Sequence, residues 1–325
     1  MAMFESEFVC QPSERFPSCH CSTIVELPDG ELLCAWYAGS AEARRDVCIL
    51  TARKLAGATE WSEPVVAVDD DPTKPMGNCV LWIDARSRVW LFYNVMHGKL
   101  DGPWGPGVRW DTCDCRYRIS EDGGRTWGDP VMLREEWNCV FRTKPLVHSG
   151  GDIIIGVEHS RENSHFFISQ DQGAGWIFTD QIPGVPNQHP ALIERRDGSI
   201  LALLRPTRDH LIARSMSSDR GRTWAAAENT NLANPHAAID MVKLTDGRVA
   251  LAFNKSPRGR SPLTLALSED EGETWPIMRD IETEQGEFSY PAIIQDRNGL
   301  LHLTYTWRRT HIRHACFDAG WIAGA

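Results

Sequence analysis

Several side chains that handle anions and protons stand where apolar runs of this sequence begin or end. Arg205 directly follows the apolar run 200–204. A guanidinium there is costly to bury unless it meets an anion or an open channel mouth. Glu158 and Glu287 are the carboxylates with acid–base potential. Tyr290 has an ordinary pKa of about 10, so it needs a partner base to react near neutrality.

Other polar residues occupy similar places, where strands would enter the centre of the fold. Buried polar groups need hydrogen-bond partners in any case, so several of these residues must be structural. The candidates for substrate binding in this set are Asn78, Arg142, His236 and Arg308.

The cysteines give no metal-binding pattern. The sequence has 10 Cys, and none forms a Cys-x-x-Cys pair. Cys19-His20-Cys21 and Cys113-Asp114-Cys115 place two thiols on one face of a strand, where they act as small buried hydrophobes. We therefore expect no metal site and no cofactor. So many unpatterned thiols fit a reducing cytoplasmic compartment.

Charge and hydropathy narrow the possible partners. The formal net charge is −10, which argues against a general nucleic-acid or anionic-membrane surface. No stretch approaches the ~18 apolar residues of a membrane helix, and the first 16 residues do not resemble a signal peptide. Any anion must therefore be bound by a local arginine cluster. The sequence leaves the oligomeric state open.

An eight-residue motif, Ser-x-Asp-x-Gly-x-Thr-Trp, organises the chain. It is intact at 120–127, 217–224 and 268–275, and at 169–176 Gly175 replaces the Thr. The closing tryptophans are 49, 48 and 51 residues apart, a period that indicates a propeller or array. We expect the Asp to fold back onto backbone N–H groups and the Trp to pack against a blade.

A second repeat, a tight turn before an apolar strand, alternates with the first. Asp-Gly or Asn-Gly between apolar runs is a strong hairpin signal. The six copies lie at 27–33, 83–90, 148–154, 196–201, 244–250 and 296–301. They predict an all-β, six-bladed β-propeller forming one domain, residues 1–325.

Three stretches depart from the period. Phe4–Cys10 is expected to be the strand that closes the ring. Thr51–Trp61 is a degenerate copy of the eight-residue motif that keeps its closing Trp. His97–Asp111, rich in Gly, Pro and Trp, is expected to be an inserted loop on a binding rim.

The eight-residue motif resembles the Asp-box, or BNR repeat, of the sialidase superfamily. Four copies at blade spacing cover nearly the whole chain. The resemblance implies a sialidase-like propeller, with the boxes on outer hairpins away from any active site. It also implies a glycan-active protein of the predicted-neuraminidase type, with an acidic oligosaccharide or glycoconjugate as substrate.

The same resemblance assigns roles to three residues. In sialidases a Tyr is the nucleophile, because the substrate carboxylate would repel an attacking carboxylate. Tyr290 matches that position. Arg205 matches the middle arginine of the three that hold the carboxylate, and Arg260, rather than Arg258, matches the third.

Other family positions are changed. His20 stands where the first arginine is expected, and His189 stands where sialidases have the Glu that activates the Tyr. Glu42 and Asp46 are approximate matches for the acid. We expect His189 to face Tyr290 directly or through one water. We also expect activity to fall at acid pH because imidazole titrates near neutrality.

Three functions follow. The first is an exo-acting glycoside hydrolase in which Tyr290, tuned by His189, works with Glu42 or Asp46 as the acid. The second is a polysaccharide lyase that cleaves a uronic acid-containing chain by β-elimination. The third is a propeller that binds glycans without turnover.

Overall fold

The computed structural model describes residues 3–98, 110–160 and 162–324. Six antiparallel sheets account for its strands, which confirms the predicted six-bladed β-propeller. The first three sheets are β2 (Ser18–Glu26), β3 (Leu32–Gly39), β4 (Cys48–Lys54) and β5 (Val65–Val68); β6 (Met76–Ile83), β7 (Val89–Met96), β8 (Cys113–Ser120) and β9 (Val131–Arg134); and β10 (Cys139–Phe141), β12 (Ile153–His159), β13 (Asn163–Ser169) and β14 (Ile177–Phe178), with β11 (Leu146–Val147) pairing β12.

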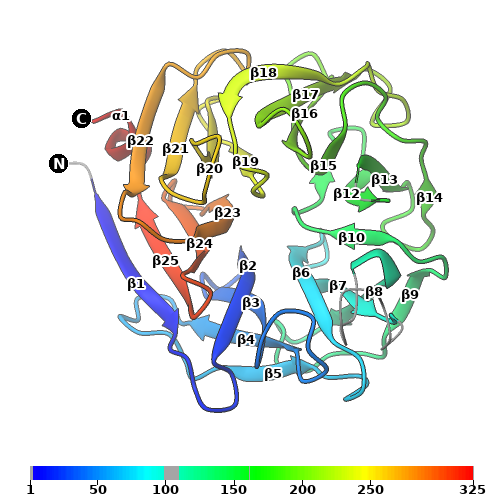
Figure 1. Cartoon of the computed structure of the whole chain (residues 1–325), viewed down its shortest axis with the longest axis vertical. Helices are drawn as coiled ribbons and strands as arrows, with labels where there is room; N and C mark the ends of the chain where they lie inside the picture. The colour runs from blue at the N-terminus through cyan, green and yellow to red at the C-terminus, as the bar shows by residue number, and fades with distance from the viewer. Residues whose placement is uncertain (1–2, 99–109, 161, 325) are drawn as a thin grey trace. The chain divides into compact units, whose positions relative to one another are not determined.

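The remaining sheets complete the set (Figure 1). They are β15 (Asn187–Glu194), β16 (Ile200–Pro206), β17 (Leu211–Ser217) and β18 (Glu228–Ala233); β19 (Asp240–Lys243), β20 (Val249–Asn254), β21 (Leu263–Ser268) and β22 (Ile277–Glu282); and β1 (Phe4–Cys10), β25 (His311–Phe317), β24 (Leu301–Trp307) and β23 (Phe288–Gln295). The last sheet contains the expected closing strand. The helices among the described residues are η1 (Trp110–Thr112) and α1 (Ala319–Ala323).

Contacts within the chain group into two compact units. The first comprises Met1–Ser6, Arg142–Leu303 and Ala315–Ala325, and the second comprises Glu7–Phe141 and Thr304–His314. The expectation of one domain over 1–325 stays a prediction. Most of the predicted inserted loop, residues 99–109, lies outside the described residues. No helix in the described ranges is long and apolar enough to cross a membrane.

The core lies between neighbouring sheets. In the first unit, Ile193 and Leu203 of one sheet pack with Met241 and Leu251 of the next, and the box residue Trp275 belongs to the same cluster. This packing confirms that a box Trp is buried against a blade. Nine of the ten cysteines are buried and all ten are free thiols.

The boxes are closed turns built on one aspartate. In the first box the Ser120 hydroxyl accepts from Gly124 N at 2.7 Å, and Asp122 accepts from Thr126 N at 2.8 Å and the Thr126 hydroxyl at 2.6 Å. Gly124 has a φ of 78°, which favours glycine. Bonds from Thr126 and Ser120 hold the pKa of Asp122 well below its usual range.

Each intact box also contacts the hairpin turn of the preceding blade. The contacts are Arg125 with Glu31 at 3.2 Å, Arg222 with Asp152 at 3.0 Å, and Glu271 with the backbone N of Arg196 at 2.9 Å. The two sequence repeats, which alternate along the chain, therefore meet between neighbouring blades at these three places.

The degenerate first box keeps its tryptophan, Trp61, and the structure shows a role for that residue. Trp61 Nε1 donates to Glu7 on the closing strand at 3.1 Å, and the same oxygen lies 3.1 Å from His314 Nδ1 and contacts Lys54. Burial alone would raise the pKa of Glu7, but bonds from His314 and Lys54 lower it to about 2. Glu7 therefore fastens the closing strand to the first blade.

Restoring the missing box threonine should stabilise the protein. Gly175 N donates to Asp171 at 2.8 Å, but the hydroxyl that bonds the second oxygen in the other boxes is lacking. We expect Gly175→Thr to raise the free energy of unfolding by about 1 kcal/mol, through one hydrogen bond and reduced chain entropy. Thr223→Gly in an intact box should lower it by a similar amount. Denaturant unfolding measures both, and an unstable Gly175→Thr would contradict the account.

The Glu7 contact should give a pH-dependent contribution to stability. We expect Glu7→Gln to lower the free energy of unfolding at pH 7 by roughly 1 kcal/mol, allowing for solvent screening. Because the folded pKa lies below the ordinary 4.5, the difference should persist above pH 4.5 and shrink as the pH falls toward 2. Glu5→Gln, on an exposed position of the same strand, is the control. Equal loss in both variants would argue against a specific role for Glu7.

Candidate active site

Two predicted residues occupy strained backbone positions, each in a strand at one end of its sheet. His189 in β15 has a φ of 46° and Tyr290 in β23 has a φ of 55°. In β15 the pairing with β16 shifts register between Gln188 and Ala191. A left-handed non-glycine residue costs of order 1–3 kcal/mol, and such residues cluster at functional sites. Both residues precede a proline, and the missing N–H of Pro190 is tolerated at the register shift in β15.

The short segment after β10 binds the carbonyl of the proline that follows each of these two residues. The Thr143 hydroxyl donates to the carbonyl of Pro190, and Arg142 Nη2 donates to the carbonyl of Pro291 at 2.5 Å. Gly156 on β12 allows the close approach, since a Cβ there would lie 2.2 Å from Pro190 Cγ. The backbone after His189 and Tyr290 is thus fixed by packing and by hydrogen bonds.

Three arginines surround the Tyr290 ring. The guanidinium carbons of Arg142, Arg260 and Arg205 lie 5.1, 5.3 and 6.0 Å from the ring centroid. Arg142 is 2% exposed. The structure therefore brings Arg205 and Arg260 together, as the sequence predicted, and adds Arg142 as the third guanidinium. Clustered guanidiniums suit a carboxylate, which they can bind with paired hydrogen bonds.

Arg205 connects the two strained residues. Its Nη1 lies 3.3 Å from His189 Nδ1 and donates to the Tyr290 hydroxyl at 3.2 Å. The His189 and Tyr290 rings are nearly perpendicular, with centroids 6.5 Å apart. The two residues face each other, and Arg205 Nη1 contacts both of them.

Glu158 lies on the other side of the imidazole. Its Oε2 is 2.9 Å from His189 Nε2, a close contact that is poorly aligned as a hydrogen bond. Burial lowers the pKa of His189 to about 4, although Glu158 acts in the opposite direction. The expectation that this imidazole titrates near neutrality was wrong. His189 is neutral at pH 7, because desolvation disfavours its cation.

Glu287 pairs with an arginine of the cluster. Its Oε1 accepts from Arg260 Nη1 at 2.6 Å and from the Ser289 hydroxyl at 3.0 Å. Phe288 N also donates to the carbonyl of Arg260 at 2.9 Å. This carboxylate therefore orients Arg260 beside Tyr290.

A partly buried ion pair continues from the same segment. Lys144 Nζ donates to both oxygens of Asp240 at 2.8 and 2.7 Å, and Asp240 also accepts from Ile293 N on β23 at 2.9 Å. Sequence reasoning missed that Arg142 to Lys144 act together. The available signal was that Arg142, like Arg205, comes directly after an apolar strand.

His236 has partners apart from the tyrosine. Its Nε2 lies 3.1 Å from the carbonyl oxygen of Arg208, and its ring stacks on His210 at 4.4 Å. Burial lowers the pKa of His236.

The remaining candidates for binding belong to the second unit. His20 is buried with its ring edge-on to Tyr37 at 5.5 Å. Asn78 is buried with a φ of 41°, and Arg308 lies 4.6 Å above the Trp307 ring. Within the described residues, no three His, Cys, Asp or Glu side chains gather as a metal-ligand group.

The two candidate acids are both hydrogen bonded within the second unit. Asp46 accepts from Ser40 N at 2.7 Å and from the Ser40 hydroxyl at 2.9 Å. Glu42 accepts from Trp110 Nε1 at 2.8 Å and from Arg309. Both carboxylates order their loop, and their role as acids stays a prediction.

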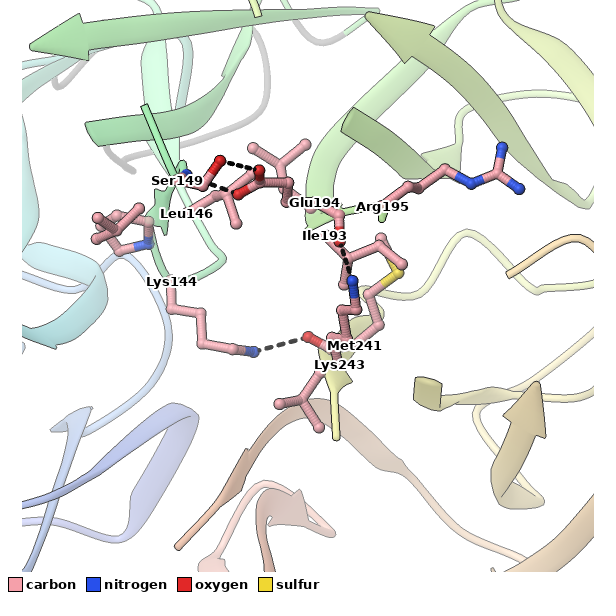
Figure 2. A pocket seen from close by; sticks show the side chains of 12 residues that line it. Lys144, Leu146, Ser149, Ile193, Glu194, Arg195, Met241 and Lys243 are labelled. Atoms are coloured by element: carbon pink, nitrogen blue, oxygen red, sulfur yellow. Dashed lines mark hydrogen bonds between the residues drawn. The ribbon is translucent and has the colours of Figure 1, made fainter. Parts of the chain in front are cut away.

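A separate cavity of about 420 Å³ opens at the opposite end of β15. It lies roughly 16 Å along the strand from His189. Figure 2 shows polar contacts within its lining: Ser149 bonds the Glu194 side chain, and Lys243 donates to the Glu194 carbonyl at 2.8 Å. Lys144 reaches the Met241 carbonyl at 2.9 Å. None of the candidate residues lines this cavity.

Comparison with solved structures supports the fold. A sialidase described as Hadza microbial sialidase Hz136 matches with a TM-score of 0.83 and 18% identity, over 97% of this chain and 69% of that one. A protein of unknown function from Dyadobacter fermentans matches with a TM-score of 0.81 and 17% identity, over 97% and 98%.

Sequence comparison identifies the family. A sialidase from Micromonospora viridifaciens is 23% identical over 98% of this chain and 54% of its own length, so the chain spans about half of that relative. The model of the BNR repeat-like domain matches residues 30–303. The chain therefore belongs to the BNR repeat-like family, within the sialidase superfamily of propellers.

Proposed function

We propose that this protein is an exo-acting glycoside hydrolase for a glycan that carries a sialic or uronic acid. The observation that carries the proposal is the set of three guanidiniums within 6.0 Å of the Tyr290 ring centroid. Such a cluster matches an anionic sugar and has no evident use for a neutral one. Distant relatives named as sialidases support the same reaction class.

In this reaction Arg142, Arg205 and Arg260 hold the sugar carboxylate beside Tyr290. The tyrosine oxygen attacks the anomeric carbon, the glycosidic oxygen leaves, and the phenolic proton passes to the neutral His189. Water then cleaves the glycosyl–tyrosine bond. Glu42 or Asp46 is the proposed proton donor to the leaving oxygen.

The neutral imidazole supports a second candidate, a uronic-acid lyase. His189 Nδ1 would take the proton from C5, the arginines would neutralise the adjacent carboxylate, and Tyr290 would protonate the leaving oxygen as the C4–O bond breaks. The sugar is left with a carbon–carbon double bond. His189 stands where sialidases have Glu, and burial keeps its imidazole neutral, so the ring can accept the proton from C5.

One assay separates the possibilities. The protein is incubated with a panel of sialosides and uronides, and both reducing ends and ultraviolet absorbance are followed. A hydrolase releases reducing ends without absorbance, whereas a lyase also produces absorbance from the unsaturated sugar. Binding without either signal would leave a glycan-binding propeller and reject the proposal.

Tyr290→Phe should lower turnover by at least ~100-fold, because the variant lacks the reacting hydroxyl. Binding of the acidic sugar should persist, since the arginines and the ring remain. Tyr117→Phe is a matched control, because Tyr117 packs against Trp90 and Phe92 in another sheet. Steady-state rates and calorimetric affinities check both. Full activity in Tyr290→Phe would move the chemistry to another residue.

Arg205→Lys should weaken binding of an acidic sugar about 10- to 100-fold. The charge remains, but the planar pair of donors is lost. Arg208→Lys, on the same hairpin but exposed and paired with Glu162 at 2.8 Å, should bind as the parent protein does. Calorimetry with an acidic sugar and its neutral analogue measures the change. Equal affinity in Arg205→Lys would remove this residue from carboxylate binding.

A further inference from the structure

One guanidinium nitrogen contacts both the base and the hydroxyl that the proposed reaction needs. Arg205 Nη1 carries two hydrogens and lies 3.3 Å from His189 Nδ1 and 3.2 Å from the Tyr290 hydroxyl oxygen. While both contacts exist, the imidazole lone pair points at the arginine. The base is present, but it is not available to the tyrosine.

Glu158 determines which ring nitrogen is the base. Its carboxylate lies 2.9 Å from Nε2 in a setting where His189 is 2% exposed. A carboxylate beside one ring nitrogen favours the proton on that nitrogen. Nε2 therefore carries the proton, and Nδ1 presents its lone pair toward Arg205 and Tyr290.

We propose that Arg205 is a clasp, which the carboxylate of the substrate opens. A carboxylate that binds the guanidinium takes over the hydrogens of Nη1, since its oxygens are stronger acceptors than a neutral imidazole or a hydroxyl. Nδ1 and the Tyr290 hydroxyl are then released toward each other. This inference rests on the proposed function for its ligand class, an acidic sugar.

The charges around His189 act in the same direction. The charged groups facing it are Glu158 on β12, Arg205 on β16 and Arg142 before β11; Tyr290 faces it from β23. Burial lowers the pKa of His189 first, Glu158 raises it, and the two arginines lower it. A bound carboxylate offsets the arginine charges, so the pKa of His189 rises. The imidazole becomes a stronger base only when an anion is bound.

The clasp can be tested on His189 itself, without an activity assay. The full chain is labelled with ¹⁵N-histidine and titrated with pH by NMR, and the His189 signals are identified as those missing from His189→Gln. In the free protein we expect the Nε2–H tautomer. Glucuronate or N-acetylneuraminate should move the Nδ1 resonance and raise the pKa of His189 by about 1 pH unit. Glucose at equal ionic strength should change neither.

Variants test the clasp without any ligand. Arg205→Met, or Arg205→Gln as a smaller disturbance, should raise the pKa of His189 and shift Nδ1 in the free protein. Glu158→Gln should lower that pKa and weaken the tautomer preference. Arg208→Met, at an exposed arginine paired with Glu162, is the matched control and should leave His189 unchanged. Circular dichroism verifies that each variant is folded.

Two results would overturn the proposal. One is a His189 signal that stays at its parent position when Arg205 is replaced. The other is a pKa of His189 that does not rise with glucuronate or N-acetylneuraminate, whether they bind or not. Turnover assays remain a separate arm. A shifted His189 without turnover keeps the clasp and rejects the hydrolase, whereas turnover with an unmoved His189 does the reverse.

Discussion

The site depends on two left-handed residues placed inside β-strands. In an unbroken strand, successive side chains alternate between the two faces of the sheet, where the core packing between blades takes them up. The left-handed residues His189 and Tyr290 escape that alternation. The prolines that follow them give their carbonyls to Thr143 and Arg142. Strain at these two residues is therefore offset by hydrogen bonds from one short segment.

Around these two residues, positive side chains slightly outnumber negative ones. Three guanidiniums face Tyr290, whereas Glu158 contacts His189 and Glu287 engages Arg260. The excess of positive charge suits one further anion. The same excess, together with burial, keeps the imidazole neutral. Anion binding and base strength are thus properties of one electrostatic arrangement and cannot be adjusted independently.

Local chemistry made the fold predictable. Asp122 closes its box through bonds to residues two to four positions away, so the motif carries its own structure. Arg205 and Tyr290 could be selected because each stands at a fixed place relative to an apolar strand. The pKa of His189 could not be predicted, because it depends on burial and on Glu158 and Arg142, which are distant in sequence. The approach of Gly156 to Pro190 was hidden for the same reason.

At the register shift in β15, the side chain of His189 is not part of the regular pairing between strands. At a regular strand position, exchanging Glu for His would disturb the packing between blades, and selection would act on stability. At position 189 the neighbouring backbone is held by Thr143 and by the contact with Gly156, so the side chain can change without moving the strand. A change of side chain at position 189 can therefore change the chemistry of the site while Thr143 and Gly156 keep the backbone in place.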